Sequence, residues 1–149
     1  MHLERFRPPP LGKLLAMPVY GERFAAGLRE VHPELPARIA EADVLGAAVV
    51  DGAIGCALSF ACQAQHIGNI QLGRAAILAL PRPPVLDRIV DVARVTLDFR
   101  DEWEVRRFLE VLWLLDVRLL RSVASAQLAS PNPEIREAAE EMLEIAGAG

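Results

Sequence analysis

The spacing of apolar residues is the feature that most constrains the fold of this chain. Between residues 21 and 143 apolar side chains recur every three or four positions, which is the period of an α-helix. No segment alternates apolar and polar residues as a half-buried strand does. Aromatic residues make up only 5% of the chain and alanine is abundant, which favours close-packed helices over sheets. We therefore predict one all-α domain over residues 1–149.

Proline and glycine divide the first half of the chain. Residues 1–20 are predicted to be an irregular, proline-rich lead, because Pro8-Pro9-Pro10 cannot lie inside a helix. Residues 21–66 are predicted to form N-terminal helices, one over 21–31 and another beginning near Pro33. We expect His66 in the last turn of its helix, with Gly68 as the C-terminal cap and Asn69 as the N-cap of the next helix.

The segment 44–62 tests whether the chain enters a membrane. Its nineteen residues carry one charge, Asp51, near the middle, whereas a spanning helix needs about twenty apolar residues. A central aspartate costs roughly 3 kcal/mol on insertion. We favour one or two buried helices broken near Asp51-Gly52 over a membrane span, with the many small residues allowing close approach of a neighbouring helix.

Charge and cysteine usage narrow the class of protein. The net charge of −4 gives no general electrostatic reason to bind nucleic acid or an anionic membrane. Cys56 and Cys62 are six residues apart, so on one helix they point to different faces, and buried reduced thiols are expected. The opening residues lack a secretory pattern. We therefore expect a cytoplasmic protein.

Helix-start signals are clear in the second half. Asp101 followed by Glu104 has the form of a capping box, and Asn132 precedes Pro133 at a first helical position. Apolar stripes complete the predicted helices, which run over about 70–80, 85–98, 102–115, 117–129 and 133–146. We expect Ile135 and its neighbours at helical spacing to face inward.

A weak repeat relates these helices. Val105-Arg106 matches Ile135-Arg136 at an offset of 30 residues, and Gly73-Arg74 lies 32 residues before Val105-Arg106. Such a period is typical of stacked helix pairs, in which each pair completes the core of its neighbour.

At these residues the sequence resembles the HEAT-repeat family, in the short bacterial form also seen in phycobilisome-lyase-type proteins. That family has a helix start followed by Pro-Glu-Ile/Val-Arg and an alanine-rich helix, as in residues 132–139. The resemblance covers residues 69–146, although Trp103 stands where the pattern places proline. It implies a HEAT-like helical-hairpin stack, or α-α superhelix, whose second helices line a concave binding surface. An irregular helical bundle is the alternative.

The 30-residue offset also aligns polar residues of the second helices. Arg88 falls over Arg118, and Asp91 falls over Arg121. We predict that these four residues form a polar row that contacts a partner, since paired arginines suit bidentate recognition of carboxylates. The alternative is an ordinary solvated helix face.

The search for catalytic chemistry yields no catalytic residue, metal site or cofactor. His66 and Cys62 would lie on one face as a thiolate pair, but two such ligands do not make a zinc site and no oxyanion donor accompanies them. The predicted function is a non-enzymatic protein-binding module, a scaffold or a regulatory, immunity-type partner of another protein. A structural subunit of a homo-oligomer and a small helical, lyase-like or cofactor-handling enzyme are the alternatives.

Overall fold

The computed structural model describes residues 7–148, and they form an all-α fold, as the spacing of apolar residues predicts. The helices are α1 (Leu11–Leu15), α2 (Tyr20–Val31), α3 (Ala42–Leu45), α4 (Ala47–Ala61), α5 (Ile67–Ala79), α6 (Arg82–Thr96), α7 (Glu102–Leu115), α8 (Val117–Gln127) and α9 (Pro133–Ala148). Two short 3₁₀ turns, Leu35–Ala37 and Ile39–Glu41, connect α2 to α3.

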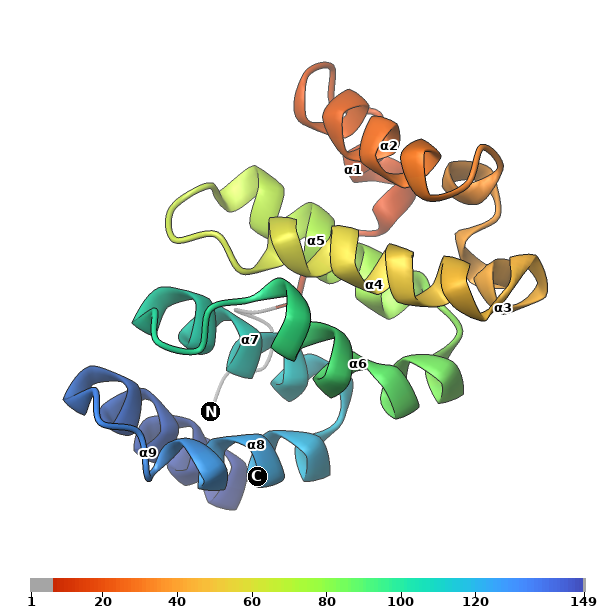
Figure 1. The fold of residues 1–149 in the computed structure, drawn as a ribbon. Helices are drawn as coiled ribbons and strands as arrows, with labels where there is room; N and C mark the ends of the chain where they lie inside the picture. The colour runs from red at the N-terminus through yellow and green to blue at the C-terminus, as the bar shows by residue number, and fades with distance from the viewer. Residues whose placement is uncertain (1–6, 149) are drawn as a thin grey trace.

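The helices stack in two layers (Figure 1). One layer holds α2, α4, α6 and α8, and the other holds α1, α5, α7 and α9. In the second layer each helix contacts the next, whereas in the first layer α6 lies close to α4 and approaches α8 far less closely. The stack therefore has one wider gap, between α6 and α8.

The spacing of the helices revises the predicted repeat. The first-layer helices α4, α6 and α8 begin at Ala47, Arg82 and Val117, which are 35 residues apart. For these helices the 30-residue offset, which aligns Arg88 with Arg118, is wrong as a register, because a shift of five residues rotates a helix position by about 140°. Helices α7 and α9, which contain the matched pairs Val105-Arg106 and Ile135-Arg136, begin 31 residues apart, close to the predicted offset.

The contacts do not divide the helices into separate pairs. The predicted contact of 102–115 with 117–129 is present, as α7 against α8, whereas α5 and α6, the predicted pair 70–80 with 85–98, do not pack closely on each other.

Small residues let α4 and α5 cross closely. A Cβ atom placed on Gly73 would lie 2.3 Å from the carbonyl oxygen of Ala57 and 2.3 Å from the backbone nitrogen of Ala61. No side chain fits in that space, so only glycine lets the two backbones come this near. The predicted close approach of the small-residue segment is confirmed.

The predicted helix caps of the second half are correct. Asp101 Oδ1 accepts hydrogen bonds from the backbone nitrogens of Trp103 (2.9 Å) and Glu104 (3.1 Å). Asn132 Oδ1 accepts one from the nitrogen of Glu134 (2.9 Å), and Pro133 opens α9. The reciprocal half of the capping box is absent from this arrangement, because the Glu104 carboxylate accepts from the backbone nitrogen of Asp98 instead.

The N-terminal predictions need correction. The lead over 1–20 is not irregular throughout, since α1 occupies Leu11–Leu15, while residues 1–6 lie outside the described part of the chain. The helix expected from Pro33 is replaced by the two 3₁₀ turns. Arg38, between the turns, has φ −130° and ψ 33°, which interrupts a continuous helix.

The segment 44–62 is broken at Gly46 and not at Asp51-Gly52. Gly46 has φ +132°, a conformation that side-chain-bearing residues rarely adopt, and α4 then runs unbroken through Asp51. Asp51 needs no break in the helix, since its side chain is 39% exposed and its carboxylate pairs with Arg88 of α6. Within residues 7–148 no helix is both long and apolar enough to cross a membrane.

The predicted boundary at residues 66–69 is also wrong. His66 does not end a helix, since α4 stops at Ala61 and His66 immediately precedes α5. Gly68 and Asn69 are not caps, because both lie inside α5. Asn69 is buried and its side-chain nitrogen donates to Gln63 Oε1 at 3.1 Å, which ties the first turns of α5 to the preceding loop.

Candidate functional site

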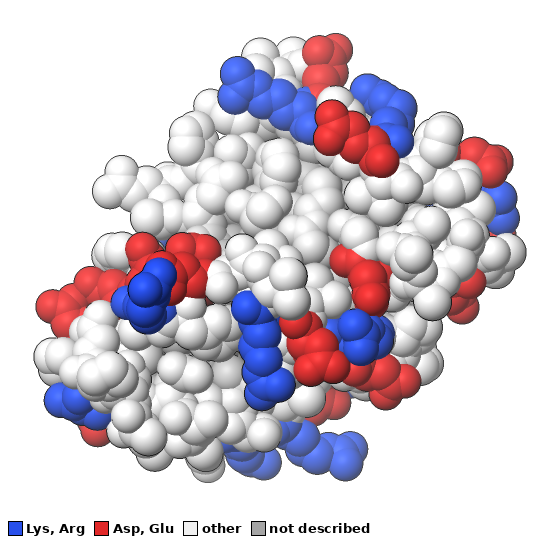
Figure 2. Space-filling view, in the orientation of Figure 1, with Lys and Arg blue, Asp and Glu red and all other residues white. Residues whose placement is uncertain are grey.

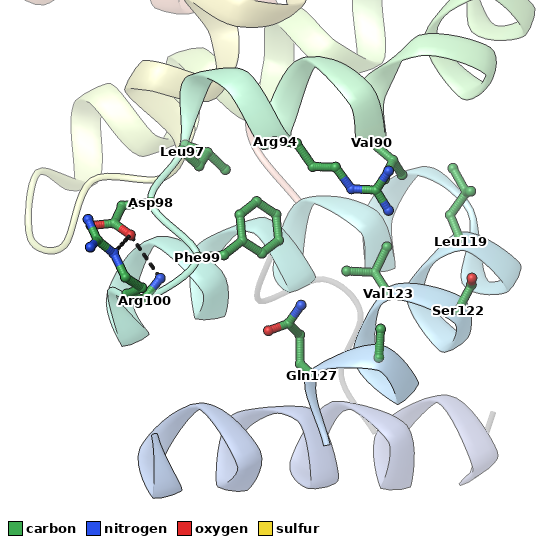
Figure 3. A pocket seen from close by; sticks show the side chains of 11 residues that line it. Val90, Arg94, Leu97, Asp98, Phe99, Arg100, Leu119, Ser122, Val123 and Gln127 are labelled. Atoms are coloured by element: carbon green, nitrogen blue, oxygen red, sulfur yellow. Dashed lines mark hydrogen bonds and ion pairs between the residues drawn. The ribbon is translucent and has the colours of Figure 1, made fainter. Parts of the chain in front are cut away.

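A half-open groove of about 570 Å³ lies between α6 and α8 (Figure 3). This volume is in the range of pockets that enclose a small molecule. Three segments line the groove: Val90, Arg94 and Leu97 of the α6 end; Asp98, Phe99 and Arg100 of the following turn; and Leu119, Ser122, Val123, Ala126 and Gln127 of α8.

The groove exists because α6 packs closely on α4, whereas on the other side only its first turn is tied down, where Arg82 donates to the carbonyl oxygen of Leu115 and to Asp116. Gly55 of α4 leaves room for Thr96 and Val92, which lie 3.5 and 3.8 Å from the position of an added Cβ atom. On its other side α6 faces α8, which is held mainly by α7 and α9. Helices α6 and α8 are therefore not closely packed against each other.

Apolar side chains form the floor of the groove. Leu97 and Val123 are each 9% exposed, and Phe99 is partly buried with its ring edge-on to Phe108, at a centroid distance of 5.9 Å. Figure 3 shows Phe99 and Arg94 reaching into the space from the α6 side, and Val123 and Gln127 from the α8 side. Protein interfaces usually have an apolar core surrounded by a polar rim, and the floor and edge of this groove have the same composition.

The charged groups at the rim differ in how they are engaged. Arg100 donates to Asp98 Oδ1 from its side chain (3.0 Å) and from its backbone nitrogen (2.9 Å), and these hydrogen bonds hold the pKa of Asp98 below its usual value. Arg94 lies 3.6 Å from Asp91, with its own side chain 69% exposed. Of the two arginines that line the groove, Arg94 therefore loses less free energy when it exchanges its carboxylate partner for another one.

The structure divides the four residues of the predicted polar row. Arg88 donates to both carboxylate oxygens of Asp51 in α4, at 3.0 and 3.2 Å, and to Asp91 at 3.3 Å. Arg121 donates to the carbonyl oxygen of Ala146 in α9 at 2.9 Å, and Arg118 is exposed on α8. Arg88 therefore faces α4, Asp91 pairs with Arg88 and Arg94 of its own helix, and Arg121 reaches towards the last helix.

The groove residues were not predicted from the sequence. Arg94, Ser122 and Gln127 belong to no motif in the sequence. Their common site depends on the distance between α6 and α8, which no local pattern reports. The exposed position of Val95, 89% accessible and next to Arg94, is an additional sign that this end of α6 is open to solvent.

A buried ionic cluster joins α5 to α7 away from the groove. Arg74, 4% exposed, pairs with Glu110, 8% exposed, and Arg107 donates to the same Glu110 oxygen at 3.0 Å. Arg107 also donates to the carbonyl oxygen of Ala64 at 3.0 Å. Burial lowers the pKa of Arg74, and the Glu110 charge opposes that effect. The cluster links both helices to the 62–66 loop.

Cys62 and His66 are not arranged as a catalytic pair. Cys62 is 3% exposed, and burial followed by the charge of Glu104 raises the pKa of its thiol far above the usual range. The His66 ring instead lies edge-on to Tyr20 at 5.8 Å. Burial also raises the pKa of Cys56, to about 11. Both cysteines are free thiols that stay protonated at neutral pH.

A second hollow, of about 370 Å³, lies beside Cys62 and is lined by Ser59, Gln63, Thr96, Trp103 and Glu104 among others. Its polar groups are engaged in local hydrogen bonds, such as that of Ser59 with the carbonyl oxygen of Cys56. Among residues 7–148 no three His, Cys, Asp or Glu side chains gather as metal ligands.

Charges of both signs are interspersed on the face that carries the groove. Figure 2 shows basic and acidic side chains in small separate clusters, with wide uncharged areas between them. A polyanion such as nucleic acid is held by a continuous basic surface. This face has no such surface, so recognition here depends on individual groups.

Comparison with known proteins identifies no relative: no family model, no curated protein and no solved structure matches this chain.

Proposed function

We propose that this protein is a protein-binding module that holds a segment of its partner in the α6–α8 groove. The observation that carries the proposal is an apolar floor, built by Leu97, Phe99 and Val123, that opens to solvent between polar side chains. Apolar side chains of a partner gain free energy by entering such a hollow, at about 25 cal/mol per Å² removed from water. The polar rim then excludes water around them.

Affinity capture with a matched pair of variants tests this proposal. Ala126 lines the groove and is exposed, so Ala126→Arg fills the hollow without disturbing the core. Ala26 is exposed on α2, and Ala26→Arg makes the same chemical change at a distance from the groove. We expect a partner protein captured by the wild type and by Ala26→Arg to be lost with Ala126→Arg. Equal capture by all three proteins would contradict the proposal.

We further propose that the stack is HEAT-like. The support is the alternation of helices between two layers and the 35-residue spacing of α4, α6 and α8. Stacked helix pairs of this kind present extended surfaces that bind other proteins. A cytoplasmic location belongs to the same proposal, and it is supported by the two free thiols, which suit a reducing compartment.

A homo-oligomer is the second candidate. Ile67, Val95 and Trp103 are 65%, 89% and 45% exposed and lie near the turns that connect the two layers. Burial of these side chains against a second copy of the chain would favour association. Light scattering coupled to size-exclusion chromatography decides between the candidates. A dimer mass that Val95→Asp returns to a monomer would favour the oligomer, and a monomer at all concentrations would exclude it.

A further inference from the structure

We infer that the α6–α8 groove recognises an acidic, apolar peptide segment, in which one bulky apolar side chain enters the hollow and an Asp or Glu beside it pairs with Arg94. This inference rests on the proposed function and names the chemistry of the partner. It follows from three features of the groove: the shape of its floor, the state of its charges and the position of its uncharged donors.

The floor has room for a bulky apolar side chain together with the peptide backbone beside it. The groove holds about 570 Å³ and is closed on the inner side by Phe99, whose edge-on contact with Phe108 fixes the ring. An aromatic side chain buries about 150–250 Å² in such a place and gains further from edge-to-face contact with a ring. Val90 and Leu119, both partly buried, lie opposite one another across the hollow in Figure 3.

The charge of the groove favours an anion. Asp98 and Arg100 neutralise each other through two side-chain contacts, at 3.0 and 3.4 Å. Arg94 contributes the remaining positive charge, and its contact with Asp91 is long, at 3.6 Å, with the two side chains 69% and 57% exposed. Such an exposed pair contributes little, so a peptide carboxylate that is shielded from water by the apolar floor competes with Asp91 successfully.

The uncharged rim suits a peptide backbone. Ser122 and Gln127 project from α8 on the opposite side from Arg94 (Figure 3). A carboxamide both donates and accepts hydrogen bonds, and a hydroxyl does the same, so these groups can pair with the N–H and C=O groups of an extended or helical segment. The three features together match a short peptide segment that has one apolar anchor and one carboxylate.

Selection from a phage-displayed library of random short peptides tests the inference. We expect the peptides retained by the wild type, and not by Ala126→Arg, to combine a bulky apolar residue with a neighbouring Asp or Glu. Arg94→Gln should weaken binding of a selected peptide about threefold to tenfold and remove the preference for an acidic residue. Arg23→Gln, an equal loss of charge on the exposed face of α2, should leave both unchanged.

Two results would overturn the inference, and they differ in what else they overturn. Groove-dependent peptides without acidic enrichment, whose binding Arg94→Gln leaves intact, would refute recognition by Arg94 and leave the binding module standing. If every selected peptide binds Ala126→Arg as well as it binds the wild type, or if no peptide is selected, both the inference and the proposed function of the groove are refuted.

Discussion

At the scale of single residues, two opposite charges are buried between α5 and α7. Arg74 and Glu110 are nearly inaccessible, and each would be strongly destabilising without the other. Arg107 reaches partly into solvent, with a side chain 22% exposed, and supplies a second donor to Glu110. Because both charges are removed from water, we expect the cluster to be sensitive to the loss of one member and to tolerate a joint apolar replacement.

Removal of the carboxylate alone should be severe. We expect Glu110→Ala to lower the free energy of unfolding by about 3 kcal/mol, because Arg74 keeps its burial and loses the carboxylate that offsets it. The double variant Arg74→Met/Glu110→Met should be markedly more stable than Glu110→Ala, since apolar side chains of similar size need no such compensation. Urea unfolding of the wild type and the two variants measures both effects. A double variant that is less stable than Glu110→Ala would contradict this account.

At the scale of helices, the helix ends that depend on neighbouring residues could be predicted from the sequence, and the features that depend on contacts between distant helices could not. The caps at Asp101 and Asn132 follow from chemistry within three residues, so the sequence predicts them correctly. Asp51 was wrongly placed at a helix break, because its exposure in the stack and its contact with Arg88, 37 residues later, leave no local pattern. The groove depends on the distance between α6 and α8, a property of the assembled layers that leaves no local pattern.

The close crossing of α4 and α5 gives a test at this scale. Gly73→Ala would force a Cβ atom into backbone atoms 2.3 Å away, and we expect it to cost about 3 kcal/mol of stability. Gly55→Ala meets its neighbours at 3.5 and 3.8 Å, which is ordinary contact, and should stabilise α4 by about 0.5–1 kcal/mol. Thermal unfolding distinguishes the two variants. A well-tolerated Gly73→Ala would mean that the helices do not cross this closely.

At the scale of the whole molecule, the central question is whether the layers act as a stack of neighbouring units. In a stack each helix pair contacts only the pairs beside it, so stability is shared between neighbours and not across the entire chain. The contacts of α8 and α9 are with α7 and with each other. An irregular bundle with one cooperative core would instead open as a unit.

Hydrogen exchange separates these two architectures. Ile135 is fully buried in α9, and Ile135→Ala should cost about 2–4 kcal/mol locally. In a stack, amide protection should fall in α8 and α9 and change little in α2, α4 and α5. An equal loss of protection in all helices would favour the irregular bundle.

The most direct test of the central claim, that the α6–α8 groove is a binding surface, is an NMR map of a bound peptide. The methyl groups of Val90, Leu119 and Val123 line the groove from both helices and report its occupancy. With an acidic, apolar peptide selected on the wild type, we predict chemical-shift changes centred on these methyl groups and on the Arg94 side chain. Changes centred on α1 and α2, with the groove methyl groups unmoved, would contradict the claim.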